Sequence, residues 1–293
     1  MYDANLIKQI CGDNAATYAR NKNRGGRNNA QGSTFENYYA AARAAHELAS
    51  ALERDDDGTA THLESQQLCF VDDLIIDKPD ERRLSQLKSG ATSWTAGDHP
   101  IADDFRLQKQ LDLALAIAAS YELVVADADQ RDALAAARPD DIDVDVVRFA
   151  YAPEVDDFLA ENPELAAAID RISIHDPKPS VRKAVFRTLV GAWVTSPERT
   201  TLAAFAEWAA TGPGPLIPTL GPEYALPTEV QDHLAGLGMD IEIRKKHLCY
   251  RFAGMLGYSA FRAGTPEFSE FERFVVQQKP TDAYVVIAAL RGA

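Results

Sequence analysis

Two short apolar segments joined by a proline-containing turn constrain the fold of this chain most. The first segment covers residues 68–76 and the second covers residues 84–88. Pro79 lies between them and cannot continue a strand through the connection. The pattern therefore predicts a β-hairpin that carries two acids, Asp72 and Asp73, in its first strand.

Polar side chains of this hairpin are expected to meet on one face. Gln86 and Lys88 share a face because side chains alternate along a strand. An antiparallel partner sets Asp72 or Asp73 beside them, and strand parity alone does not choose between the two. Carboxylate and amide oxygens suit Mg²⁺ or Mn²⁺, and a neighbouring lysine can orient or deprotonate a metal-bound water. Asp73, Asp72 and Gln86 are therefore the expected metal ligands, with Lys88 stabilising an attacking hydroxide.

An aspartate, a turn and then Gln86-x-Lys88 resembles the PD-(D/E)xK nuclease superfamily, in the variant with glutamine before the lysine. That variant is typical of Mrr-like restriction enzymes and of nuclease effectors in bacterial anti-phage systems. The resemblance covers roughly residues 32–125 and includes a preceding helix that carries Glu36. It implies an Mg²⁺-dependent endonuclease acting on DNA, with RNA also possible, and Glu36 as a further metal ligand. It also implies a sensor or ATPase protein partner that switches the nuclease on.

Other interpretations of the same residues remain open. Asp72 and Asp73 also suit an edge strand whose charges face water, and Lys88 suits a solvated strand end. Glu36 equally suits the first turn of a helix, where an acid favours the helix dipole. Glutamine in place of a carboxylate weakens a metal site. The alternative function is therefore a non-catalytic scaffold or interaction subunit that uses a degenerate nuclease fold.

A segment rich in glycine and asparagine, residues 12–33, carries four basic residues. We expect it to be a loop that contacts nucleic-acid phosphates through Arg20, Lys22, Arg24 and Arg27. The net charge of the chain is −14, so DNA binding requires such a local basic surface. A solvated N-terminal arm is the alternative interpretation.

Composition places the chain among soluble globular proteins, with 46% hydrophobic and 25% charged residues. No apolar stretch approaches the length needed to span a bilayer, so we expect no membrane contact. The three cysteines form no CxxC pair and no signal peptide is evident, which favours the cytoplasm. Cys69 is expected in the core, whereas Trp94 either stacks on a base or lies in the core.

The order of the expected elements predicts an α/β fold with a restriction-endonuclease-like mixed sheet flanked by helices. Helices are expected at 34–52, 101–120, 129–137, 154–170, 180–194 and 200–210. Strands are expected at 68–76, 84–88, 121–125, 144–149, 239–243, 248–252 and 284–289. The character of the chain changes after Pro153, and a linker rich in proline and glycine covers 212–222. We therefore expect a nuclease domain at 1–152 and a helical α+β region at 153–293 that contacts a partner or regulates the first.

Overall fold

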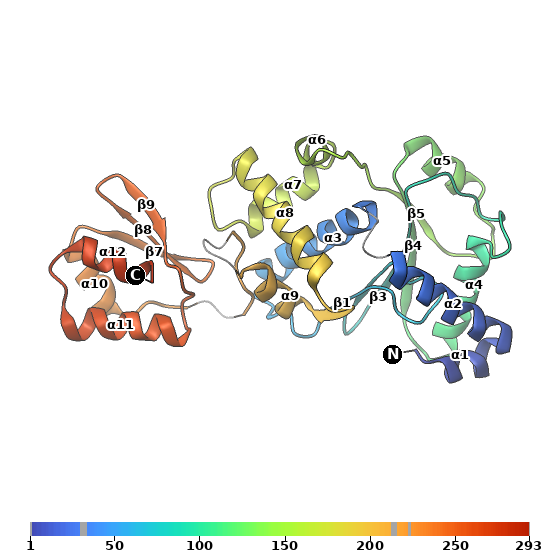
Figure 1. Cartoon of the computed structure of the whole chain (residues 1–293), viewed down its shortest axis with the longest axis horizontal. Coiled ribbons are helices and arrows are strands. Elements are labelled where there is room, and N and C mark those ends of the chain that lie inside the picture. Colours follow the sequence, from blue (N-terminus) through green and yellow to red (C-terminus); the bar gives the residue numbers. More distant parts are fainter. Residues whose placement is uncertain (1, 30–33, 212–215, 222–223, 293) are drawn as a thin grey trace.

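A six-stranded mixed sheet with helices on both faces forms the larger part of the molecule in the computed structural model (Figure 1). The structure describes residues 2–29, 34–211, 216–221 and 224–292, with backbone only for 25–29. The strands are β1 (His62–Glu64), β2 (Leu74–Asp77), β3 (Arg82–Lys88), β4 (Ala119–Val125), β5 (Asp145–Arg148) and β6 (Arg199–Thr201). Their order is β5-β4-β3-β2-β1-β6. The β3–β4 and β4–β5 pairs are parallel, and the other pairs are antiparallel.

Helices cover the two faces of the sheet in separate groups (Figure 1). One face carries α1 (Ala4–Cys11), α2 (Asp13–Asn29), α4 (Ile101–Ala114) and α5 (Ala128–Ala136). The other face carries α3 (Thr34–Glu53), α6 (Val155–Glu161), α7 (Pro163–Ile172), α8 (Pro179–Thr195) and α9 (Leu202–Ala209). Strand alternation divides β3 between them: Leu84 packs on the α2 and α4 side, and Leu87 packs on the α3 side. Gln86 has the parity of Leu84 and therefore points toward α2.

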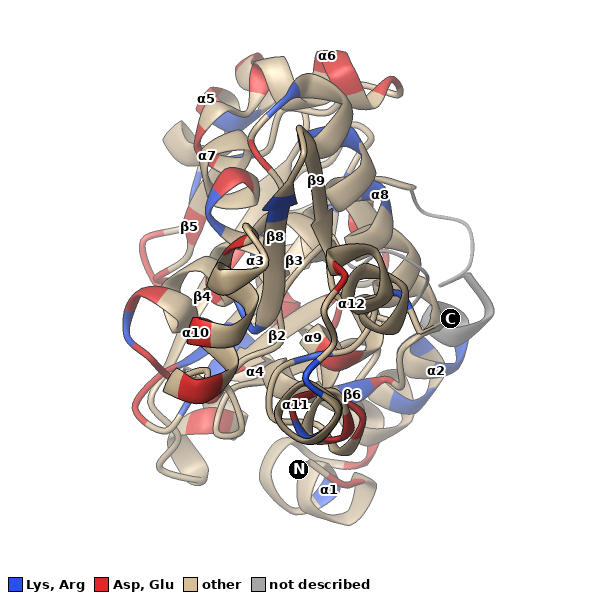
Figure 2. Ribbon diagram, turned by 90° about the vertical axis from the view of Figure 1, so that its left-hand side faces the viewer, with Lys and Arg blue, Asp and Glu red and all other residues tan. Residues whose placement is uncertain are grey.

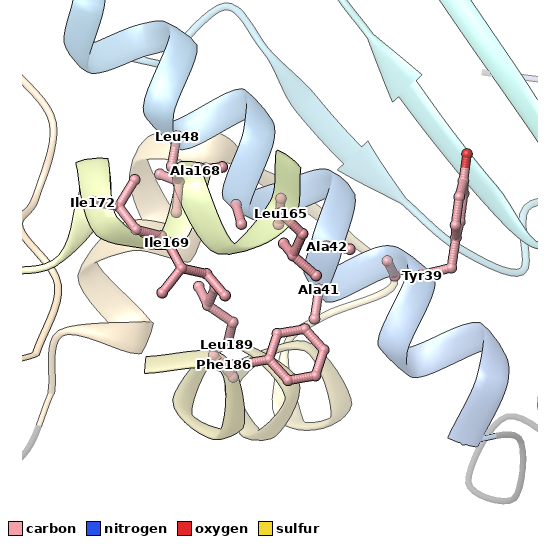
Figure 3. Packing of buried hydrophobic residues seen from close by; sticks show 14 of the residues in the cluster. Tyr39, Ala41, Ala42, Leu48, Leu165, Ala168, Ile169, Ile172, Phe186 and Leu189 are labelled. Atoms are coloured by element: carbon pink, nitrogen blue, oxygen red, sulfur yellow. The ribbon is translucent and has the colours of Figure 1, made fainter. Parts of the chain in front are cut away.

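Small side chains allow α3 to pack closely against its neighbours (Figure 3). Ala41 and Ala42 lie beside Leu165 of α7, and Phe186 of α8 lies on the same side. Tyr39 points the other way, toward the strands, where its hydroxyl donates a hydrogen bond to buried Glu122 of β4. Alanine combines high helix propensity with a small volume, so α3 can be buried on several sides at once.

A second, smaller unit follows at the C-terminal end (Figure 1). It consists of the antiparallel strands β7 (Asp240–Arg244), β8 (His247–Phe252) and β9 (Met255–Tyr258), with the helices α10 (Thr228–Gly236), α11 (Pro266–Gln278) and α12 (Ala283–Leu290). These elements enclose their own apolar core. Polar and ring contacts join the two units, including the Arg244–Asp176 ion pair at 3.1 Å and the His175–Tyr258 ring contact at 4.6 Å.

The expected division at residues 152 and 153 does not coincide with a boundary between the two cores. Strand β6 pairs with β1, so residues 199–201 belong to the main sheet. The core around α3 extends to Ile217, and the separate C-terminal core begins at Leu226. The change in sequence character after Pro153 marks only a connection, because α7 and α8 are needed to cover the second apolar side of α3.

Several expected elements differ from the observed ones because tertiary contacts override the local pattern. The strand expected at 284–289 is wrong, since Asp282 caps a helix there and that helix packs into the C-terminal core. Of the strand expected at 68–76, only the last residues form β2. The residues before them form a turn, in which the backbone N–H of Gln66 donates to the carbonyl oxygen of Asp72 at 2.8 Å. The helix expected at 101–120 ends at Ala114, before Ala116 with φ 54°. The helix expected at 154–170 is divided at Pro163, which begins α7.

Charged residues are spread over many elements (Figure 2). Lysines and arginines lie on α2 and α8 among other places, and acids lie on α6 and α10. Within the residues that the structure describes, no helix is long and apolar enough to cross a membrane.

His247, buried in the C-terminal unit, predicts a loss of stability in mild acid. Burial lowers the pKa of His247 from 6.5 to about 4, and neither ring nitrogen has a hydrogen-bond partner. Between these values the unfolded chain binds a proton that the folded chain does not, so stability rises with pH across this window and falls as pH drops from 6.5 toward 4. The expected loss is roughly 2–3 kcal/mol. Hydrogen exchange of the β8 amides at several pH values measures it.

The control for this prediction is His247→Leu, which cannot titrate at that position. Its β8 amides should show a much shallower dependence on pH than those of the wild type after correction for intrinsic exchange. If the two proteins lose protection in parallel between pH 6.5 and 4.5, another group is responsible.

Candidate functional site

The junction of β2 and β3 brings Asp73 and Gln86 together. Leu74 pairs with Ser85 in the antiparallel ladder, so Asp73, the residue before β2, lies opposite Gln86. The Asp73 Oδ2 atom accepts hydrogen bonds from the Leu87 amide, at 2.7 Å, and from the side-chain amide of Gln86. The proximity expected from strand alternation is therefore present, and the carboxylate of Asp73 is fixed against the end of β3.

The ammonium of Lys22 lies at the centre of the polar residues around this junction. Lys22 Nζ donates to the carbonyl oxygen of Phe70, to Gln86 Oε1 at 3.0 Å and to Asp104 Oδ2 at 2.8 Å. Asp72 Oδ1 is 3.6 Å from the same nitrogen. Burial favours the neutral form of Lys22, but the carboxylates of Asp72 and Asp104 outweigh burial and raise its pKa, so it remains charged.

Asp72 is the most unusual carboxylate of this group. Its side chain is 2% exposed, and its Oδ1 atom has no hydrogen-bond partner. Every N–H of the Lys22 ammonium already has another acceptor, so Asp72 receives only the attraction of that charge. Burial raises the pKa of Asp72 from 3.8 to about 7; Lys22 opposes this rise, while Asp73 adds to it. The structure thus contains a buried carboxylate oxygen that has no hydrogen-bond donor, with the ammonium of Lys22 3.6 Å away.

Lys88 ends β3 and is half-buried. Its positive charge lowers the pKa of Asp72, which places it within electrostatic reach of that carboxylate. In the described part of the chain it forms no ion pair shorter than 4 Å. Lys88 therefore lies near Asp72 but forms no ion pair with it.

Glu36 is not among the oxygens that contact Lys22. It lies in the first turn of α3 and is half-buried. Helix α3 packs on the opposite face of the sheet from α2, so Glu36 belongs to a helix on the other face from Lys22. The structure does not bring it together with Asp72 or Asp73 through any hydrogen bond seen in the described residues.

The segment expected to be a phosphate-contacting loop is a helix, which corrects the interpretation of residues 12–33. Three alanines of α2, Ala15, Ala16 and Ala19, pack into the core beside α4, and the helix continues to Asn29. Lys22 points inward from this helix and is therefore unavailable to phosphates. Arg20 and Arg24 are exposed one turn apart. The side chain of Arg27 and residues 30–33 lie outside the described residues.

A row of buried polar residues along α4 was missed by sequence reasoning. Asp104, Gln108 and Asp112 are all at most 5% exposed and follow one another at helical spacing. Asp104 accepts from Lys22 and, at 2.8 Å, from the Tyr18 hydroxyl; Gln108 accepts from the Phe70 amide at 3.0 Å. The sequence could have indicated this burial through helical spacing. Asp104, Gln108 and Asp112 fall on the same side of the helix as apolar Ile101, Phe105 and Leu111.

Trp94 and Cys69 belong to the core. The Trp94 ring is 3% exposed, and its Nε1 atom donates to Leu134 O at 2.8 Å. Cys69 is fully buried in the same cluster. The interpretation in which Trp94 packs inside the protein is therefore the correct one, and base stacking by this ring is excluded in the observed conformation.

The oxygen atoms around Lys22 are of the kinds that coordinate a hard cation. Carboxylate, amide and carbonyl oxygens are the ligands that Mg²⁺ and Mn²⁺ prefer, and Asp72 Oδ1 is buried without a partner. In the observed conformation, however, no group of three or more His, Cys, Asp or Glu side chains among the described residues is arranged to hold a metal ion. The residues fit a metal in their chemistry, while the ammonium of Lys22 contacts the same oxygens.

Comparison of the chain with protein-family models, with curated proteins and with solved structures finds no match. The fold that these residues form is a mixed α/β arrangement with a six-stranded sheet flanked by helices and a second small sheet. Any function assigned to it rests on the geometry of the Asp72, Asp73 and Gln86 group.

Proposed function

We propose that the chain is a metal-dependent nuclease of the PD-(D/E)xK type that hydrolyses phosphodiester bonds in DNA. The observation that supports it best is the contact of Asp73 with Gln86 beside buried Asp72, at the end of the strand that carries Lys88. This is the set of residue types that the resemblance implies, and it comes from two sequence segments joined by the predicted turn.

The order of elements also supports this proposal. A helix, α3, precedes the antiparallel strands β1, β2 and β3, and α4 then leads to β4, which is parallel to β3. Apart from the short strand β1, this is the order expected for a restriction-endonuclease-like sheet. The acidic group lies at the end of β3 that is joined to α4 by a loop.

The proposal gives each residue a role. Asp72, Asp73 and Gln86 would hold Mg²⁺ or Mn²⁺, with Glu36 as a further ligand, and a bound metal would supply a water activated for attack. The Lys88 ammonium stabilises negative charge that develops on the phosphate and on the attacking oxygen. Arg20 and Arg24 are exposed on α2 and would contact the nucleic-acid backbone, together with Arg27.

A role in anti-phage defence with a sensor or ATPase partner is part of the proposal. The C-terminal unit is the expected contact region, since it has its own core. Leu256, Tyr284 and Val285 of this unit are each about half exposed, which supplies apolar surface for a protein contact.

The alternative is a non-catalytic scaffold that retains a degenerate nuclease fold. The position of Lys22 favours it, because its ammonium already offsets charge on the buried acids without a metal. Calorimetric titration with Mg²⁺ separates the two proposals, since a scaffold should show no binding that depends on Asp72 or Asp73.

Asp73→Asn tests the nuclease proposal with little change in structure. The asparagine oxygen can still accept from the Leu87 amide, so the end of β3 should remain intact, whereas the metal loses a charged ligand. We expect at least about a hundredfold loss of Mg²⁺-dependent DNA cleavage. The assay should use both the wild-type chain and a Lys22→Met background.

Two outcomes would contradict the proposal. Cleavage by Asp73→Asn at the rate of its parent would remove Asp73 from the chemistry. Absence of cleavage of DNA and of RNA in both backgrounds, with partner present, would favour the scaffold.

A further inference from the structure

Lys22 takes the place of a cation among oxygen atoms. Its ammonium contacts Phe70 O, Gln86 Oε1 and Asp104 Oδ2, with Asp72 Oδ1 at 3.6 Å. Three kinds of neutral or anionic oxygen thus surround one nitrogen, and no apolar group intervenes in these contacts. The same mixture of donors forms protein sites for divalent cations.

The charge of this group is incompletely balanced. Asp72 and Asp104 are both at most 5% exposed, and Asp73 accepts a hydrogen bond from the Gln86 side chain. When all three acids are ionised, they bring more negative charge than the ammonium of Lys22 cancels. Asp72 Oδ1 remains without a hydrogen-bond donor. A divalent ion would supply a second positive charge, and its water ligands could donate hydrogen bonds to Asp72 Oδ1. An ammonium carries one charge, and its three N–H donors point in fixed tetrahedral directions.

Helix α2 is suited to leave this position without disrupting the sheet. It precedes all strands in the sequence. Its buried core residues are Ala15, Ala16 and Ala19, and the ring of half-buried Tyr18 stacks on Phe70 and His99. Alanine buries little apolar area, so the half-buried Tyr18 ring is the main large apolar contact of α2 among the described residues. Its polar anchors are Tyr18 to Asp104, Asn23 to Gln66 O and Lys22 itself.

We propose that Lys22 and a divalent cation compete for the oxygens of Phe70, Asp72, Gln86 and Asp104, so that α2 is an internal lock on this cation site. The lock matters for catalysis only if the proposed nuclease function is correct, but the competition itself is a property of binding. When Lys22 has left these oxygens, Asp104 is therefore one of the ligands of the cation.

The test is Mn²⁺ binding to the full-length chain, measured by electron paramagnetic resonance titration together with thermal unfolding. Lys22→Met removes the ammonium and keeps a side chain of similar length. We expect it to bind Mn²⁺ at least about tenfold more tightly than the wild type, and millimolar Mn²⁺ to raise its Tm by about 5 °C. Lys8→Met, which removes an exposed lysine of α1, should behave as the wild type.

Asp104→Asn in the Lys22→Met background locates the ion. This second substitution should abolish the gain in affinity. Binding by Lys22→Met that is no tighter than wild type, or tight binding that survives Asp104→Asn, would overturn the proposal.

If Lys22→Met does not fold, hydrogen exchange of the wild-type protein decides the matter. Competition requires that Mn²⁺ accelerate exchange of the α2 amides while the β3 amides stay protected. Unchanged α2 exchange at tens of millimolar Mn²⁺ would overturn the proposal.

DNA cleavage, measured separately, distinguishes this inference from the nuclease function. Tight Mn²⁺ binding by Lys22→Met without cleavage supports the lock and contradicts the nuclease. Metal-dependent cleavage by the wild type with no effect of Lys22→Met on affinity supports the nuclease and contradicts the lock.

Discussion

Lys88→Met should lower the rate of DNA cleavage by roughly 10³-fold while leaving the unfolding curve almost unchanged. The loss is large because Lys88 lies on β3 with its charge within reach of Asp72, so it would act on charge that develops at the phosphate. The fold is insensitive because Lys88 is half-buried at a strand end and forms no ion pair shorter than 4 Å in the described residues. Cleavage of a supercoiled plasmid with Mg²⁺ measures the rate, in whichever of the wild-type and Lys22→Met backgrounds is more active.

Lys8→Met is the matched control for this substitution. It removes the same charge from an exposed position on α1, where its partner is Asp13 at 2.8 Å. Its cleavage rate should equal that of its parent. A Lys88→Met protein that cuts as fast as Lys8→Met would exclude Lys88 from the reaction.

Asp112→Ala should lower the free energy of unfolding by roughly 3–5 kcal/mol. Asp112 is 1% exposed and accepts hydrogen bonds from the Tyr2 hydroxyl, from the Tyr121 hydroxyl at 2.7 Å and from the Gln108 amide at 3.1 Å. Alanine removes the acceptor of the Tyr2 and Tyr121 hydroxyls, while the Gln108 amide keeps its hydrogen bond to the Tyr2 hydroxyl at 2.9 Å. Asp112 also ties the N-terminus to α4 and β4. Urea unfolding followed by circular dichroism measures the change.

Asp143→Ala provides the comparison, because Asp143 is exposed and its loss should change stability by less than about 0.5 kcal/mol. A change of similar size in the two variants would show that water replaces Asp112 as the acceptor. In that case the row of polar residues on α4 contributes little to stability.

Local rules predicted the centre of the sheet well. Pro79 interrupts the two strands where expected, and alternation along β3 correctly predicted that Gln86 would meet an aspartate. These features depend on neighbours in sequence or on a short antiparallel pairing, which a pattern of residues records directly. The nuclease chemistry that this arrangement suggests stays a prediction.

Long-range packing decided what the pattern missed. Residues 12–29 contain glycines and asparagines that favour a loop, yet the burial of Ala15, Ala16 and Ala19 in the core shared with α1 and α4 makes them helical and turns Lys22 inward. Asp104 belongs to the same case, because its partner Lys22 is far away in the sequence. Neither residue type nor spacing records which distant segment will cover a given face.

The pairing of β6 with β1 has a consequence for synthesis of this protein on the ribosome. The edge of the sheet beside β1 stays open until residues 199–201 have emerged, and one apolar side of α3 stays uncovered until α7 and α8 follow. A nascent chain of about half the final length therefore presents unpaired backbone groups and exposed alanines, leucines and phenylalanines. Cotranslational chaperones would meet their substrate at this stage, well before the C-terminal unit has been made.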